Sequence, residues 1–242
     1  MPCQTASPDA PMQETAPPAS DTGKPRRTEP RTVRRRQLIE ATIDSIAQYG
    51  IAGTTMSTVT DIAGLSLGLA NFHFQSKQNL LEETLKFLAR EHRDHWRRAY
   101  GNAGLSARNK LMAIVDSHFD PKICTPRKLA VWYAFFGEGG RRTVYRALVD
   151  ALDNERFALS KRLCSDIARE GGYSGPTVDT IAHTLEGLYD GLWLNILMYP
   201  DTFDRDAARV KVLAYLAMAY PLHFEMPQAA RAEPARRAGK LG

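Results

Sequence analysis

The chain has 242 residues, 43% hydrophobic and 24% charged, an ordinary globular composition that suffices for one large or two small domains. The net charge is +5, and three cysteines without CxxC spacing disfavour both a disulfide framework and a zinc site. The longest strongly apolar run, residues 192–199, is too short to cross a bilayer, and the N-terminus carries no apolar signal-peptide region. We therefore expect a cytoplasmic protein with no membrane partner.

Both ends of the chain differ from its middle. Residues 1–30 are rich in Pro, Ala, Ser and Thr without apolar periodicity, and we expect a disordered N-terminal extension there; residues 226–242 are expected to form a disordered basic tail. Residues 24–36 carry seven basic side chains against one acid, whereas residues 37–230 are close to neutral. Such a basic arm commonly binds nucleic acid, the alternative being a solvated tail that aids solubility.

Between these ends, apolar residues recur at helical spacing without β-type alternation, which predicts an all-α fold. The first helix is expected from about Thr32 to Tyr49, with Gly50 as its C-terminal stop. Its predicted inward face consists of Ile39, Ile43, Ile46 and Ala47.

Three further helices are predicted from their capping residues. Thr55 is the expected N-cap of a short helix that ends at Gly64, Ser66 caps a second short helix, and Ser76 caps a long one. The first short helix should bury Met56, Val59 and Ile62, and the second carries Leu69 and Phe72. The long helix has apolar or aromatic side chains at helical spacing, namely Leu81, Leu85, Leu88, His92 and Trp96.

The remaining helices are expected at about residues 105–119, 126–137, 143–170, 177–199 and 205–220. We predict a DNA-binding domain over residues 31–78 and a helical effector-binding and dimerisation domain over residues 79–225.

Two short capped helices joined by a glycine turn form a helix-turn-helix arrangement. The second helix, "SLGLANFHF", has no carboxylate that would repel phosphates in a major groove. Gly68 does not stabilise a helix, so its use is close backbone approach to DNA or to the preceding helix. Asn71 can form the bidentate contact that reads adenine.

The segment "RRRQLIEATIDSIAQYG…TTMSTVTDIAGLSLGLANFHFQSKQNLLEETL" resembles the DNA-binding domain of the tetracycline-repressor (TetR) family. The resemblance covers about residues 31–86. It implies a homodimeric transcriptional repressor that binds a palindromic double-stranded DNA operator and a small effector, with no cofactor and no catalytic site. Departures from the family pattern are Leu67, where a polar or small residue is usual, and His73, where Tyr is common.

The resemblance also implies which residues contact DNA. Phosphate contacts are expected from Thr55, Ser66, His73 and Lys77. The candidates for facing bases are Leu67, Leu69, Ala70 and Asn71. Arg34, Arg35 and Arg36 are expected to bind phosphate on grounds of charge. The structural alternatives are that Thr55 and Ser66 serve only as caps, that Leu69 belongs to the core, and that the arginines are solvated.

Two later segments concentrate aromatic side chains next to acids. "KLAVWYAFFGEGG" and "LEGLYDGLWLNILMY" resemble segments of BetI-type, choline-responsive repressors, over about residues 105–222. An aromatic cage with a carboxylate is suited to a quaternary ammonium ligand such as choline or betaine aldehyde. The candidate ligand residues are Trp132, Tyr133, Phe136, Glu138, Tyr189, Asp190 and Trp193. The alternatives are ordinary core and dimer packing, or another apolar or aromatic effector.

Two other functions compete with that of a ligand-gated repressor. His92 and His95 have i, i+3 spacing, but the motif is not HExxH and is surrounded by arginines, so we expect no metal site and no enzyme. A DNA-binding protein without an effector stays open. The long helix after Ser76 joins the two predicted domains and is the expected lever, and the 177–199 and 205–220 helices are the expected dimer interface.

Overall fold

The computed structural model describes residues 30–101, 104–140 and 142–231, and these contain helices and no strand. This confirms the all-α prediction. The expected extension before Pro30 and the tail beyond Arg231 lie outside the described residues. No helix in the described ranges is long and apolar enough to cross a bilayer.

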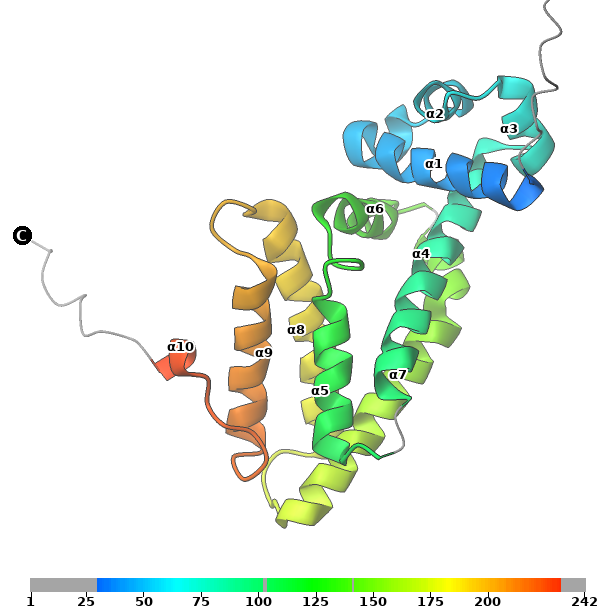
Figure 1. Ribbon diagram of the computed structural model, residues 1–242. Coiled ribbons are helices and arrows are strands. Elements are labelled where there is room, and N and C mark those ends of the chain that lie inside the picture. The colour runs from blue at the N-terminus through cyan, green and yellow to red at the C-terminus, as the bar shows by residue number, and fades with distance from the viewer. Residues whose placement is uncertain (1–29, 102–103, 141, 232–242) are drawn as a thin grey trace, which may run out of the picture.

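Four helices build the N-terminal part: α1 (Arg31–Gly53), α2 (Met56–Ala63), α3 (Leu67–Phe74) and the long α4 (Lys77–Tyr100) (Figure 1). The predicted caps are confirmed, because the hydroxyls of Thr55, Ser66 and Ser76 each accept a hydrogen bond from the backbone N–H three residues on, at 3.0, 3.2 and 3.1 Å. Gly50 breaks α1 at φ 68° and ψ 174°, and Gly64 turns the chain out of α2 at φ 62°.

The interior of this part is closed by large apolar side chains from all four helices, among them Leu38, Ile43, Val59, Phe74 and Leu80. Two side chains predicted to face inward do not, because Ala47 and Ile62 are exposed. Phe72, which the second short helix was expected to carry, is 65% exposed. An eight-residue helix has too few turns for its spacing alone to fix which face is buried, so the neighbouring helices decide it.

Six helices follow: α5 (Ala107–His118), α6 (Pro126–Gly137), α7 (Arg142–Gly171), α8 (Val178–Met198), α9 (Arg205–Ala219) and the short α10 (Gln228–Arg231). The first five agree with the predicted ranges. The last one begins after Pro227 within a stretch expected to be disordered. In Figure 1, α5, α8 and α9 form part of a bundle, and α6 lies at the end of that bundle, against α1.

Candidate DNA-binding surface and effector cavity

The exposed face of α3 is formed by Leu67, Gly68, Asn71 and Phe72. The guanidinium of Arg31, at the start of α1, lies 5.4 Å from the centre of the Phe72 ring. A Cβ at Gly68 would meet no described atom within 4 Å, so this glycine is not needed for contact with the preceding helix. The face therefore offers an amide, apolar groups, open backbone and a nearby cation, with no carboxylate from α3 itself.

The three predicted arginines have different partners. Arg36 is exposed; it pairs with Glu40 at 3.4 Å and lies over the Phe87 ring. Arg34 donates to the side chain of Gln37. Arg35 is the exception, because its guanidinium is used inside the protein.

The guanidinium of Arg35 forms an ion pair with Glu83 at 2.6 Å and donates to the His73 carbonyl at 3.1 Å. It also lies 4.4 Å from the centre of the Phe74 ring. These partners belong to α3 and α4, so Arg35 ties α1 to both helices. Its expected phosphate contact is corrected to a structural role.

Burial corrects two further expectations. Ala70 is completely buried and His73 is 6% exposed, so neither side chain faces a groove. Burial, aided by Arg31 and Arg35, lowers the pKa of His73, which keeps the ring uncharged.

Leu69 is half-buried, and the Lys77 ammonium donates to the Ile51 carbonyl at 2.8 Å, which fastens the start of α4 to the end of α1.

A cavity that opens to solvent lies between the helices of the C-terminal part. Its walls come from α4, α5, α6, α7 and α8. Five predicted ligand residues line it together: Trp132, Phe136, Tyr189, Asp190 and Trp193. Four residues that sequence reasoning missed complete the wall: His92, His118, Asp153 and Arg156.

Two predicted ligand residues lie elsewhere. The hydroxyl of Tyr133 donates to the Asp190 carbonyl at 2.5 Å, which fixes α6 against α8 next to the cavity. Glu138 follows the end of α6 and lines a separate pocket with Lys77 and Tyr145, so its expected ligand contact in the aromatic cavity is corrected.

The inner wall of the cavity is a stack of aromatic and imidazole rings. The rings of His118 and Tyr189 are parallel with centroids 3.9 Å apart, and His92 meets His118 edge-on at 4.8 Å. The Trp193 indole N–H donates to the His118 carbonyl at 3.0 Å. Burial lowers the pKa of His118 to about 3, and burial together with His118 and Arg156 lowers that of His92 far below its usual value. Both imidazoles are therefore neutral at pH 7.

Carboxylates outnumber cations around the cavity. Arg156 pairs with Glu186, and it lies 3.4 Å from Asp153. Asp190 lines the same cavity. Burial raises the pKa of Asp153 and of Asp190, and the opposing effect of Arg156 does not offset it. With the histidines neutral, three acids face one arginine, so the electrostatics favour a cationic ligand.

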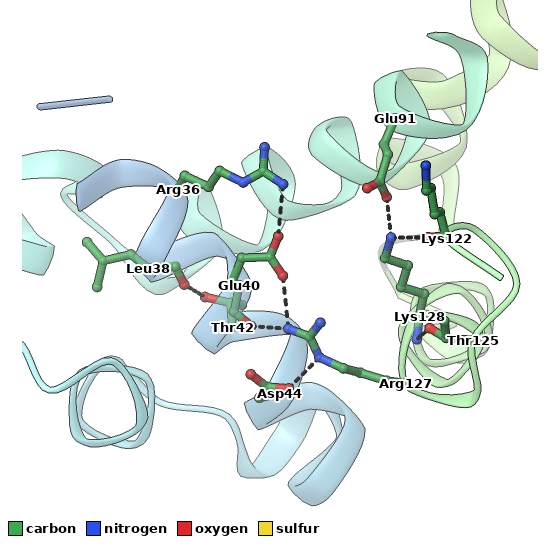
Figure 2. Close-up of polar contacts among 10 residues, drawn as sticks. All are labelled: Arg36, Leu38, Glu40, Thr42, Asp44, Glu91, Lys122, Thr125, Arg127 and Lys128. Atoms are coloured by element: carbon green, nitrogen blue, oxygen red, sulfur yellow. Dashed lines mark hydrogen bonds and ion pairs between the residues drawn. The ribbon is translucent and has the colours of Figure 1, made fainter. Parts of the chain in front are cut away.

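Helix α6 connects this cavity to the DNA-binding part. Trp132 and Phe136 line the cavity, whereas Arg127 at the start of α6 contacts α1. Figure 2 shows Arg127 between Glu40 and Asp44: its guanidinium donates to the Glu40 carbonyl at 2.9 Å and carboxylate at 3.0 Å, and pairs with Asp44. These carboxylates raise the pKa of Arg127, although burial opposes the shift.

Exposed apolar and small residues form a stripe on α8. Gly187, Gly191, Leu194 and Met198 follow one another at helical spacing, and each is exposed. A Cβ at either glycine would meet no described atom within 4 Å. Near the end of α9, Met218 is 67% exposed. The stripe makes an open apolar face on α8, and Met218 adds an exposed apolar side chain on α9.

Comparison with known proteins places both parts of the chain. Residues 38–84 match the family model for bacterial regulatory proteins of the tetR family, and residues 107–221 match the C-terminal domain model of BetI-type transcriptional repressors. HTH-type transcriptional regulators BetI from Paraburkholderia phytofirmans and Paraburkholderia xenovorans are 32% and 33% identical to the chain over 178 residues, which cover 74% of the chain and 89% of each relative.

Solved structures show the same fold. A transcriptional regulator from Pseudomonas aeruginosa PAO1 superposes with a TM-score of 0.69 at 29% identity, covering 81% of this chain and 95% of that one. A regulator from Saccharomonospora viridis, solved in complex with choline, superposes with a TM-score of 0.67 at 20% identity, covering 76% and 96%. The chain belongs to the TetR family of transcriptional regulators, with a repressor domain of the BetI type.

Proposed function

We propose that this protein is a homodimeric repressor that binds a palindromic operator through α3 and is released by a small cationic effector bound in the aromatic cavity. We place the DNA-binding domain at residues 31–78 and the effector and dimer domain at residues 79–225. The observation that carries the effector is the cavity itself, in which aromatic rings and excess carboxylates surround one space. As a transcriptional regulator, the protein is proposed to act in the cytoplasm.

The DNA contacts are assigned to exposed groups and to the half-buried Arg34. Asn71 is the side chain of α3 that can read a base edge bidentately, and Leu67 can contact a thymine methyl. Arg34 and Arg36 are placed on phosphates, together with Arg31 beside Phe72. The hydroxyls of Thr55 and Ser66 are exposed, so they can approach phosphate as well as cap their helices.

Dimerisation is assigned to the apolar face of α8 and α9. Two copies of this face make a four-helix interface, an arrangement in which helices pack closely where side chains are small. Gly187 and Gly191 supply such positions, and Leu194 and Met198 supply apolar area. A dimer is required because a palindromic operator presents two half-sites, one helical turn or about 34–36 Å apart.

The aromatic rings and the carboxylates of the cavity support an effector of the choline type. Cation–π contacts contribute up to about 2 kcal/mol each when desolvated, and Trp132, Trp193, Phe136 and Tyr189 all line the cavity. Asp153 and Asp190 supply the opposite charge. The regulator from Saccharomonospora viridis that shares this fold was solved with choline, which supports a cation of this class here.

Effector binding is proposed to reach DNA through α4 and α6. The first carries His92 at the cavity and Lys77 at α1; the second carries Trp132 at the cavity and Arg127 at α1. A shift of either helix on ligand binding changes the position of α1 and hence of α3. A coupling free energy of about 1–3 kcal/mol changes DNA affinity roughly 5- to 150-fold.

The test is binding of the full chain to the DNA upstream of its own gene, at fixed salt, with and without choline and betaine aldehyde. The proposal predicts tight, sequence-specific binding that either compound weakens, and an Asp190→Asn variant that binds the DNA equally well but responds at least tenfold more weakly. Asp201→Asn, a carboxylate outside the cavity, is the matched control. Specific binding indifferent to both compounds would leave a repressor without this effector class.

A further inference from the structure

A second pocket lies between the DNA-binding part and the effector part of the chain. Its walls come from the end of α1, the start of α4, the chain after α6 and the start of α7, and they include Lys77, Glu138 and Tyr145. None of the described residues that line it also lines the aromatic cavity. A molecule bound in this pocket would contact both parts of the protein at once.

The pocket carries one positive and one negative side chain, both half-buried. The Lys77 ammonium donates to the Ile51 carbonyl at 2.8 Å, which uses one of its three hydrogens. The Glu138 carboxylate has no hydrogen-bond or ion-pair partner among the described residues. Lys77 and Glu138 therefore do not neutralise each other, and both charges are available to a bound molecule.

A third polar group at this pocket lacks a partner. Tyr145 is 3% exposed, its ring packs edge-on against Phe135 with centroids 4.7 Å apart, and its hydroxyl has no hydrogen-bond partner among the described residues. Nearly all buried hydroxyls in folded proteins are hydrogen-bonded, and a tyrosine hydroxyl can donate to a carboxylate. The wall is also partly apolar, because the buried side chains of Ile51 and Leu81 line it.

We propose that this pocket binds an α-amino acid with an aliphatic side chain. Its carboxylate accepts hydrogen bonds from Lys77 and Tyr145, and its ammonium group donates to Glu138. The aliphatic side chain packs against Ile51 and Leu81. A simple anion would meet the negative charge of Glu138 and a simple cation that of Lys77, so a zwitterion matches the pocket better than either. Binding here requires neither DNA nor the cationic effector, so the site goes beyond the proposed repressor function.

Calorimetric titration of the full chain with three probes tests the site. L-leucine carries both charges, 4-methylpentanoate has the same carbon chain and carboxylate without the ammonium group, and L-leucinamide keeps the ammonium group but has an uncharged amide. L-leucine is expected to bind at least tenfold more tightly than either of the others, because it alone satisfies Lys77 and Glu138 together.

Glu138→Gln keeps the shape of the side chain and removes its negative charge. L-leucine affinity should fall at least tenfold in this variant, whereas the affinity for 4-methylpentanoate, which has no ammonium group, should not fall. Glu225→Gln, an exposed glutamate outside the pocket, is the matched control and should leave both affinities unchanged.

Tyr145→Phe removes only a hydroxyl, and it tests the carboxylate end of the site. It should weaken L-leucine and 4-methylpentanoate at least threefold. Three results would overturn the proposal: no binding of L-leucine, equal affinities for the three probes, or an L-leucine affinity that Glu138→Gln leaves unchanged. Each of these results would leave the binding of DNA and of a cationic effector untouched, because the titrations contain neither.

Discussion

The rings of His118 and Tyr189 lie parallel, with centroids 3.9 Å apart and 10° between their planes. They come from α5 and α8, and His92 of α4 packs edge-on against the first. At the inner wall of the cavity, side chains from three helices therefore pack together. Burial and the nearby Arg156 keep its two histidines neutral. This arrangement has a consequence for stability in acid.

The free energy of unfolding should decrease as the pH is lowered, because His118 stays uncharged in the folded protein. Its pKa is about 3 in the folded protein against 6.5 in the unfolded chain, so below pH 6.5 only the unfolded state binds the proton. The free energy of unfolding then decreases by about 1.5 kcal/mol between pH 6.5 and 5 for this one group. His118→Phe lacks the effect, so the stability difference between wild type and variant should shift by that amount in urea unfolding at the two pH values. His92, Asp153 and Asp190 titrate in both proteins, so their effects on the stability difference largely cancel. A stability difference that is the same at both pH values would contradict a neutral, buried His118 imidazole.

The proposed base contact of Asn71 on α3 and the proposed phosphate contact of Arg36 on α1 should differ in their salt dependence. Asn71→Ala is expected to cost about 1–3 kcal/mol at the operator and to relax specificity at one base pair. Arg36→Ala should weaken operator and unrelated DNA alike and reduce the slope of log affinity against log salt by about 1. Fluorescence anisotropy titrations at several salt concentrations measure both. Arg162→Ala, an exposed arginine on α7, should change neither quantity.

Arg127 should transmit the effector signal. Arg127→Ala removes the link between α6 and α1, so choline should release operator DNA at least threefold less effectively. Choline affinity itself should be nearly unchanged, because Arg127 does not line the cavity. The measurement is the ratio of operator affinities with and without saturating choline. An unchanged ratio in the variant would assign the coupling to α4 alone.

The apolar face of α8 should hold the dimer. Leu194→Glu or Met198→Glu places a charge in the proposed interface, and sedimentation velocity should show a monomer at concentrations where the wild type is dimeric. Val144→Glu on α7 has a similar initial exposure and serves as the control, which should stay dimeric. A dimeric Leu194→Glu protein would place the interface elsewhere.

The helices could be predicted because their ends are marked locally. Thr55, Ser66 and Ser76 each accept from the third following N–H, and Gly50 and Gly64 adopt positive φ, as their positions before and after apolar periods indicated. Such signals depend only on neighbours along the chain. The two segments with Trp132 and Trp193 could likewise be recognised as walls of one site, because their aromatic and acidic composition is dense.

Other features depend on contacts that no local pattern encodes. His118 and Arg156 reach the cavity from helices whose sequences show no aromatic cluster, and only packing brings them to Tyr189. Arg35 lies between Arg34 and Arg36 in the sequence, yet its guanidinium forms an ion pair with Glu83 on α4. Glu138 comes two residues after Phe136, but α6 has ended at Gly137 and the chain carries the carboxylate to another pocket.

The most direct test of a ligand-gated repressor is the affinity of choline for the protein alone and for the same protein saturated with operator DNA. Linkage requires that the two ligands affect each other by the same factor. We predict that choline binds the DNA complex at least fivefold more weakly than the DNA-free protein, matching its effect on operator affinity. Equal choline affinities in the two states would contradict it, because the cavity and the α3 surface would then be uncoupled.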